Sequence, residues 1–362
     1  MGEVIRTTGI MGLLTMLLVS NSVLADDADV FNLSARASYS HDSNLFRLDR
    51  GVASPVPGKT SRSDNIYGLT AGLSLNKPIS LQRFKLNASV SSNTFANYDY
   101  LDNNTLQYNG AWNWHVTPRI SGILSLTRNE ALNGFDNYRT FTGQNMRTTL
   151  TDRFEADIWV KSNWHGLVGL VHDKLNNSQL FEQESNSRSL GWNVGARYDT
   201  GTGRTLTLRY IQRDGDYTDR PVDLVNNFDD AFTQRDYELT LAYPLNDKTR
   251  IDGVIGYVDR SHPHISARDF DGLRGQLGLD WKMAGKVGLK AEVRRRVESW
   301  QDSQSSYSIT NGISVGPQWL ITAKQRLDAR IEYDKRQYEG PLPLTVGPLR
   351  EDSLGALVLN WG

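Results

Sequence analysis

Charged side chains stand at every second position in two segments of the sequence, residues 290–298 and 326–336. Both signs occur in each segment, so neighbouring charges could pair with one another. Groups of this kind could also set an electric field across a passage, or hydrogen-bond the hydroxyls and acidic groups of a polar ligand. With two arginines from another such segment, the candidate residues are Arg209, Arg213, Lys290, Glu292, Arg294, Arg296, Arg326, Asp328, Arg330, Glu332, Asp334 and Arg336. Two interpretations stay open: a surface for a polar ligand, or an ion-pair network that keeps a wall rigid.

The elements that carry these charges are predicted to be β-strands, because apolar residues fill the alternate positions. Leu327, Ala329, Ile331 and Tyr333 alternate with the charges of residues 326–336. Strict alternation predicts a strand with one apolar and one polar face. The same pattern recurs along most of the chain after residue 28, and no helical repeat of apolar residues competes with it.

The connections between the predicted strands alternate in length. Short, turn-like links lie at residues 76–78, 117–118, 161–163, 199–203, 246–247, 284–285 and 322–323, and longer polar stretches at 49–60, 97–104, 129–145, 176–184, 214–230, 259–269, 301–306 and 339–348. This layout is typical of an antiparallel barrel with short periplasmic turns and long external loops. We predict an all-β fold, a transmembrane up-and-down antiparallel β-barrel of about sixteen strands; about eighteen is the alternative, because the chain ends Trp361-Gly362 and not on an aromatic residue.

Aromatic residues are sorted by strand end, as in the two aromatic girdles of a membrane barrel. Most tryptophans lie toward the short links and the tyrosines toward the long stretches, while Trp192 and Trp300 do not join the group near the short links. The tryptophans are Trp112, Trp114, Trp159, Trp164, Trp281, Trp319 and Trp361, and the tyrosines are Tyr67, Tyr210, Tyr237, Tyr257, Tyr307 and Tyr333.

The composition narrows the class of protein. The 362 residues include no cysteine, which excludes disulfide frameworks and cysteine-ligated metal centres, and the net charge of -1 gives no reason to expect a nucleic-acid partner. One apolar run, residues 10–19, follows Arg6 and precedes Ala25, which is the layout of a secretory signal peptide. We expect a signal peptide at residues 1–25, cleaved near Ala25, and a barrel domain at 26–362 in the outer membrane of a Gram-negative bacterium.

No arrangement of residues indicates catalysis. The histidines have no serine or cysteine partner at motif spacing, and no glycine-rich phosphate loop occurs. His262-Pro263-His264 is a possible metal pair, but no acidic cluster stands next to it in the sequence, and Asp229-Asp230 lacks the glycine-spaced ligand series of a calcium loop. We expect a protein that is not an enzyme and has neither a cofactor nor a bound metal.

Three short motifs carry a resemblance to a known family. The first predicted strand leads into Asp42-Ser43-Asn44-Leu45-Phe46-Arg47, while Arg62-Ser63-Asp64-Asn65 precedes the second strand and Arg350-Glu351-Asp352-Ser353 the last. In these motifs and in its architecture the chain resembles the outer-membrane β-barrels encoded with exopolysaccharide-biosynthesis clusters, the EpsL-type, exosortase-linked family. The resemblance implies a role in moving a secreted polysaccharide across the outer membrane.

The expected function is therefore an outer-membrane channel that exports an exopolysaccharide through a hydrated lumen lined by the charged candidates. Two alternatives stay open: a general or substrate-selective diffusion porin for small polar solutes, and a structural or adhesin-like surface barrel. The expected partners are outer-membrane lipid and lipopolysaccharide, a polysaccharide or other polar solute, and periplasmic export proteins.

Overall fold

The structure, a computed structural model, describes residues 14–16, 30–48, 52, 54, 56–135, 142–179, 186–322, 325–343 and 345–361. Long β-strands make up most of this chain. They are β2 (Phe31–Asp42), β3 (Asp64–Ile79), β4 (Gln82–Phe95), β5 (Asn103–Thr117), β6 (Ile120–Leu132), β7 (Met146–Lys161), β8 (Trp164–Asn177), β9 (Ser187–Asp199), β10 (Thr205–Tyr217), β11 (Ala231–Asn246), β12 (Thr249–Ser261), β13 (Phe270–Ala284), β14 (Val287–Ser299), β15 (Ser305–Leu320), β16 (Arg326–Pro341) and β17 (Glu351–Trp361). The predicted all-β class is confirmed.

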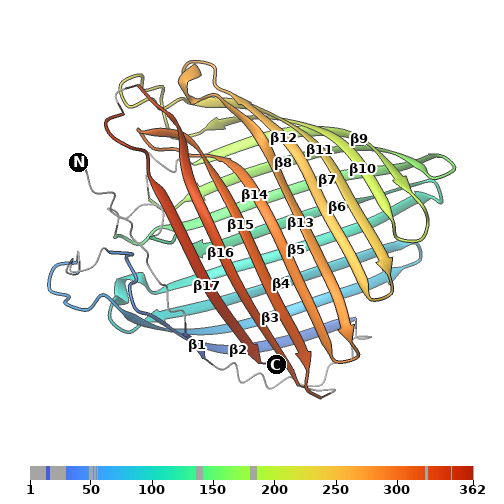
Figure 1. Cartoon of the computed structure of the whole chain (residues 1–362), viewed down its shortest axis with the longest axis horizontal. Coiled ribbons are helices and arrows are strands. Elements are labelled where there is room, and N and C mark those ends of the chain that lie inside the picture. The colour runs from blue at the N-terminus through green and yellow to red at the C-terminus, as the bar shows by residue number, and fades with distance from the viewer. Residues whose placement is uncertain are drawn as a thin grey trace.

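Each long strand pairs antiparallel with the next one along the chain, and together they form one sheet that curves into a barrel (Figure 1). The described residues form sixteen long strands, which is the preferred count, and the alternative of about eighteen stays open. A three-residue strand, β1 (Leu14–Met16), pairs with β2 and approaches β17, so it lies along the seam between the first and last long strands. Apart from β1, the expected signal peptide and its cleavage position at Ala25 lie outside the described residues.

Short and longer links alternate along the chain, as predicted, except that loop 300–304 is no longer than the longest short links. Two residues join β3 to β4, β5 to β6, β7 to β8, β11 to β12 and β13 to β14, and five residues join β9 to β10 and β15 to β16. Ser80 and Ser162, in two of these turns, have positive φ angles of 55° and 51°, which two-residue hairpin turns require. The opposite end carries loops 43–63, 96–102, 133–145, 178–186, 218–230, 262–269, 300–304 and 342–350. Figure 1 shows these long loops toward the left and the upper left.

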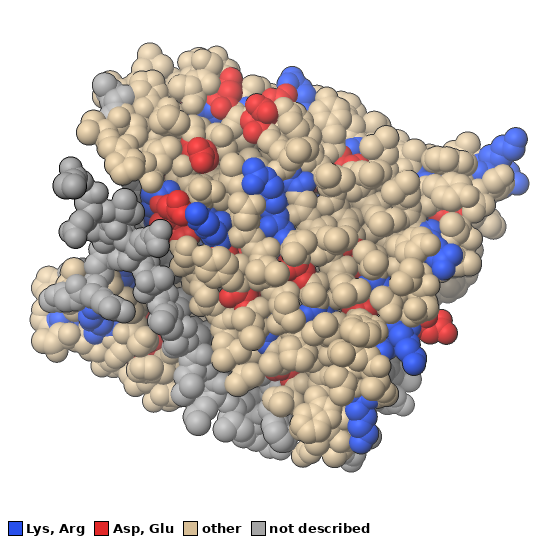
Figure 2. Space-filling view, in the orientation of Figure 1, with Lys and Arg blue, Asp and Glu red and all other residues tan. Residues whose placement is uncertain are grey.

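The outer face of the barrel is apolar. Leu69, Leu208 and Leu277, on three different strands, point outward and are each more than half exposed. The wall in Figure 2 is mostly uncharged. Lys and Arg atoms project along its short-turn edge, and further patches of both signs lie toward the upper left. In lipid every backbone amide needs a partner, and the continuous ladder of antiparallel strands supplies one. Within the described ranges, no helix is long and apolar enough to span a membrane.

The predicted aromatic girdles are largely confirmed. Trp112, Trp164, Trp281 and Trp319 are exposed near the short turns, and Tyr67, Tyr237 and Tyr257 are exposed toward the long loops, whereas Tyr333 is exposed in the middle of β16. Trp159 differs, because it pairs with His165 on the inner face, where the Arg119 guanidinium lies 4.7 Å from its ring centre. The side chain of Trp361 lies outside the described residues.

At the long-loop end, many buried side chains belong to two groups of loops. The first loop assembly comprises the described parts of loops 43–63, 96–102 and 133–145, and its apolar core is Leu45, Phe46, Phe95, Tyr98, Leu101 and Phe135. The second loop assembly comprises the described parts of loops 218–230, 262–269, 300–304 and 342–350, and it buries the charged or polar residues Arg220, Asn227, Asp229, His262 and Arg268. The two assemblies stand above different parts of the barrel wall.

Candidate transport lumen

All of the predicted lumen residues lie on the inner face of the barrel. Ion pairs between strands that are not neighbours establish this orientation, because such side chains converge only on the concave side of a curved sheet. Arg209 on β10, for example, lies 2.8 Å from Glu155 on β7, with β8 and β9 between them. The inner orientation is therefore confirmed, while contact of these residues with a ligand stays a prediction.

The lumen face of β7–β16, here called the ionic wall, is held by such cross-strand pairs. Arg294 on β14 reaches across β15 to Glu332 and Asp334 on β16, with Nη2 2.6 Å from an Asp334 oxygen, and its Nη1 donates to Glu292 at 3.1 Å. The Arg294 side chain is only 2% exposed. A guanidinium removed from water to this extent needs its carboxylate partners.

A glycine on the intervening strand makes room for this bridge. Gly312 of β15 pairs with Arg294 on one side and with Asp334 on the other. A Cβ atom at residue 312 would collide with Asp334 Oδ1 and with Arg294 Nε. The sequence thus sets long charged residues on alternate strands and removes the side chain between them.

The same arrangement recurs between β8 and β13. Arg213 on β10 lies 2.7 Å from Asp236 on β11 and 3.7 Å from Asp173 on β8. Arg274 on β13 lies 3.1 Å from the same Asp236, whose side chain is fully buried, and also pairs with Glu238. Most charged side chains of the ionic wall therefore pair with one another.

The lumen face of β2–β6, here called the hydroxyl–amide wall, is built differently. Its residues align in rows across the strands, such as Asn32, Ser74, Asn87, Asn109 and Thr127. Hydrogen bonds join neighbours in these rows, for example Thr70 Oγ1 to Ser91 Oγ at 2.8 Å and Asn109 Nδ2 to Thr127 Oγ1 at 2.9 Å. Among the residues described in these five strands, no ion pair joins two strands.

Many groups of the hydroxyl–amide wall remain open to the lumen. Asn87, Gln107 and Asn109 are exposed, although they lie on the concave face. An amide offers both a donor and an acceptor, and a hydroxyl does the same. This wall can exchange hydrogen bonds with any solute that carries hydroxyl groups.

Buried arginines hold the second loop assembly together. Arg268 is 0% exposed and donates to three backbone carbonyls, those of Asn227, Trp300 and Asp302. Arg220 donates to the Asp229 carbonyl at 2.9 Å and stacks 3.7 Å from the centre of the Tyr217 ring. Burial, followed by the charge of Arg220, lowers the pKa of Arg268 to about 10.

Asn227 shows how far loop 218–230 extends. Its Nδ2 lies 3.3 Å from the Pro343 carbonyl in loop 342–350. Two other hairpins, β12–β13 and β14–β15, come between these loops in the order of the sheet. Loop 218–230 therefore leans across the end of the barrel instead of standing upright on its own strands.

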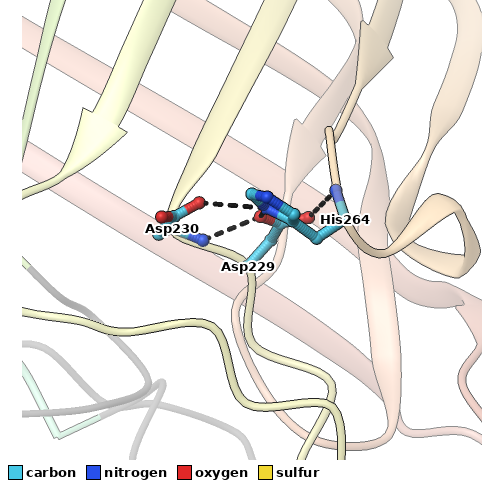
Figure 3. A group of neighbouring side chains, drawn as sticks. All are labelled: Asp229, Asp230 and His264. Carbon is cyan, nitrogen blue, oxygen red and sulfur yellow. Dashed lines mark hydrogen bonds and ion pairs between the residues drawn. The ribbon is translucent and has the colours of Figure 1, made fainter.

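A carboxylate clasp joins loops 218–230 and 262–269 within this assembly (Figure 3). Asp229, which is 0% exposed, accepts hydrogen bonds from the backbone N–H groups of Asp230, His264 and Ile265, and its Oδ1 lies 3.0 Å from His264 Nδ1. Asp230 Oδ1 lies 3.3 Å from the same ring nitrogen. The fold therefore places beside His264 two acidic groups from a different loop, which the sequence does not place next to it.

These three side chains could offer a metal ion ligand atoms within 4.8 Å of one another. Both oxygens of Asp229 already accept hydrogen bonds, so a metal would have to compete with the backbone of loop 262–269. The arrangement fits a structural clasp better than a metal centre. The prediction of no bound metal stays a prediction.

The two histidines of loop 262–269 have opposite environments. Burial, followed by the charge of Arg260, lowers the pKa of His262 to about 3. The hydrogen bond with Asp229 raises the pKa of His264, whose ring is half exposed. Although burial opposes it, hydrogen bonds from His264 and the backbone keep the pKa of Asp229 below its ordinary value. His262 is thus held neutral and His264 is favoured as the cation.

Several residues of the ionic wall were not among the sequence candidates. They are Glu155, Asp157, Asp173, Arg197, Asp236, Glu238 and Arg274, which supply the partners of the predicted arginines or belong to the same network. They alternate with apolar residues as the candidates do, so the same signal could have found them. The pairing between strands could not have been read from it, because it depends on the register and on glycines such as Gly312.

The comparisons with known proteins give no family. No family model matches the sequence, and no curated protein matches it. Among solved structures, the chain is similar to a mutant of the ferric enterobactin receptor PfeA of Pseudomonas aeruginosa (12% identity, 85% of this chain and 53% of that one, TM-score 0.41). It is also similar to the FrpB iron transporter of Neisseria meningitidis (11%, 85% and 58%, TM-score 0.45) and to the copper transporter OprC (12%, 92% and 67%, TM-score 0.42). The chain spans less than two thirds of the length of PfeA and of FrpB.

The class of protein follows from the structure itself. A curved sheet of sixteen antiparallel strands, an apolar outer face and a polar lumen define an outer-membrane β-barrel. Short turns at one end and long loops at the other are features of the same class.

Proposed function

We propose that the protein is an outer-membrane channel through which a polysaccharide is exported. The observation that carries the proposal is the hydroxyl–amide wall, whose rows of side chains run across β2–β6. Sugar hydroxyls can exchange hydrogen bonds along such rows without being held at any one of them. Conduction requires contacts of this kind, favourable enough for entry and weak enough for exit.

The ionic wall supports the proposal in a second way. Since its arginines and carboxylates mostly pair with each other, it offers few strong ligands and keeps the barrel wide. A barrel of about sixteen strands leaves room for an aqueous channel. The proposed partners are outer-membrane lipid, the polymer, and periplasmic proteins that deliver it to the short-turn end.

The test is an export assay in a strain that lacks the gene. We expect this strain to retain polysaccharide in the periplasm, and the native chain to restore its release into the medium. The double variant Ser89→Leu/Ser91→Leu places two apolar side chains on the lumen face of β4 and should lower release several-fold. Ser92→Leu/Thr94→Leu is the matched control, because Ser92 and Thr94 lie on the outer face of the same strand.

Normal release of polysaccharide by the deletion strain would contradict the proposal. So would equal effects of the two double variants, provided that both reach the membrane in the folded form. Uptake of small sugars or ions that is lost with the gene, without any change in polysaccharide release, would instead favour a diffusion porin.

A further inference from the structure

The lumen also carries cations that no carboxylate neutralises. Arg36, Arg83 and Lys85 lie on the hydroxyl–amide wall, and Arg153 and Arg296 lie on the ionic wall. All five are exposed, and within the described chain none has a carboxylate at ion-pair distance. They differ in this respect from Arg209, Arg213, Arg274 and Arg294, whose carboxylate partners are described above.

Acidic residues of the lumen face are more fully engaged. Glu155, Asp236, Glu292, Glu332 and Asp334 all pair with arginines. Glu298 is exposed, but it acts electrostatically on Arg336. The charges left over for a passing solute are therefore mainly positive, although the whole chain has a net charge of -1.

Two of these cations face the same stretch of lumen. Lys85, Ala111, Ser125 and Arg153 form one row across β4, β5, β6 and β7. At the usual spacing between strands the two Cα atoms stand roughly 14 Å apart. Only the small side chains of Ala111 and Ser125 lie between them, so the space in front of the row stays open to an anionic group.

The cations are also spread along the passage. Arg83 lies close to the β3–β4 turn, whereas Arg36 belongs to the row of Ser91, six residues beyond Lys85 on β4. Six residues of a strand span roughly 20 Å. No single small anion bridges this distance, but a chain with repeated acidic groups does.

We infer that the lumen is built for an anionic polymer, a polysaccharide that carries carboxylates along its length. The inference rests on the proposed export function and adds the charge of the substrate to it. The acidic groups would pass from Arg83 and Lys85 to Arg36, while the hydroxyls of the sugars exchange hydrogen bonds with the rows of the same wall. Exposed ion pairs are weak, so contacts spaced in this way guide the polymer without trapping it.

The first test measures ion selectivity of the purified native chain in planar bilayers under a KCl gradient. The reversal potential should show a preference for chloride over potassium. The triple variant Arg36→Gln/Arg83→Gln/Lys85→Gln should lose most of that preference. Lys335→Gln, which removes a cation paired with Glu351 on the outer face, is the control and should keep it.

The second test needs no variant and uses two polymers of matched length, polygalacturonate and neutral dextran. Polygalacturonate should reduce the conductance of the native chain at a concentration at least tenfold lower than dextran. Equal block by dextran, or a preference for potassium, would contradict the inference that the substrate is anionic. Neither result would contradict the proposed channel. Absence of any conductance, even after the long loops are deleted, would overturn the proposed channel itself.

Discussion

The two walls of the lumen solve one problem with different chemistry. Both must line a wide barrel with polar side chains and hold neighbouring strands in register. The ionic wall uses arginine–carboxylate bridges that pass over a third strand, as Arg294 passes over Gly312 to Asp334. The hydroxyl–amide wall uses short hydrogen bonds between adjacent strands, as between Thr70 and Ser91. In the ionic wall most charged groups pair with one another across strands. In the hydroxyl–amide wall many polar groups remain available to a solute.

The loops above the barrel repeat this difference. The first loop assembly encloses an apolar core around Phe46 and Tyr98, whose rings lie 4.9 Å apart in an edge-to-face arrangement. The second loop assembly encloses Arg268 and Arg220 among aromatic rings and backbone carbonyls. Apolar packing carries no charge that titrates or is screened, whereas a core of charged groups responds to pH and to electrostatic screening by salt.

The largest effect is expected where the ionic wall is most buried. The double variant Glu332→Gln/Asp334→Asn leaves the Arg294 guanidinium with only Glu292, in a place from which water is almost excluded. We expect the free energy of unfolding to fall by about 3 kcal/mol, within the range for breaking a buried ion pair. Urea unfolding in lipid vesicles would measure it.

The matched change on the hydroxyl–amide wall is Asn93→Ala, which removes a neutral hydrogen bond of 3.0 Å to Asn103. It should cost roughly 1 kcal/mol. Gly312→Ala gives an independent check, because it keeps every charge but inserts a Cβ atom between Arg294 and Asp334. If Gly312→Ala were as mild as Asn93→Ala, the bridge over β15 would not be what stabilises the ionic wall.

An intermediate effect is expected at Asp64, the first residue of β3, which lies against the first loop assembly. This carboxylate is 0% exposed and accepts hydrogen bonds from the backbone N–H groups of Asn65, Asn97 and Tyr98. Asp64→Ala leaves those amides without their partner and should cost about 2 kcal/mol, within the range for unsatisfied buried groups. Amide hydrogen exchange at Asn97 and Tyr98 should accelerate.

Asp229→Ala is the counterpart in the second loop assembly. Its effect should stay confined to the amides of Asp230, His264 and Ile265, because Arg268 continues to join loops 218–230, 262–269 and 300–304. Exchange at Tyr98 that is unchanged by Asp64→Ala would show that the apolar core alone holds the first loop assembly.

The sequence predicts the barrel well because its signal is repeated in every strand. Alternation of apolar and polar residues assigns the faces, and the alternating lengths of the links assign the two ends and the number of strands. Trp159 shows the limit of this reasoning. Its place near a short turn was correctly predicted, but its facing the lumen was not, because sorting tryptophans by strand end ignores the face of the strand. Trp159 stands two residues after Asp157 and therefore shares the inner face of β7.

The contacts within the two loop assemblies could not be predicted from the sequence, for a different reason. Loop 218–230 and loop 262–269 are separated by two strands in the sequence, and nothing local indicates that Asp229 meets His264. Arg268 looks like any surface arginine, yet it is 0% exposed, since the backbone carbonyls of two other loops converge on it. Contacts of this kind depend on how the whole barrel end closes, which no spacing of residues encodes.

The smallest predicted effect separates the two loop assemblies by pH. The neutral, buried His262 has a folded pKa of about 3, so stability is lost as the pH falls from its unfolded pKa of about 6.5. His264 has a raised folded pKa, so its contribution is fully present below about 6.5 and is lost as the pH rises through the folded value. Protection of the amides in loop 262–269 from hydrogen exchange should therefore be highest near pH 6.5 and lower on both sides.

Two variants test the two sides of this pH profile separately, because His264 acts at high pH and His262 at low pH. His264→Gln should abolish the loss at high pH and keep the loss at low pH. His262→Gln should keep the loss at high pH and abolish the loss between about pH 6.5 and about pH 4, below which protonation of Asp229, whose folded pKa is lowered, still weakens the loop. The Tyr98 amide of the first loop assembly, corrected for the intrinsic pH dependence of exchange, is the internal reference. If both variants changed the same side of the profile, the two histidines would be acting as one group, and the opposite environments created by Arg260 and Asp229 would not govern this loop.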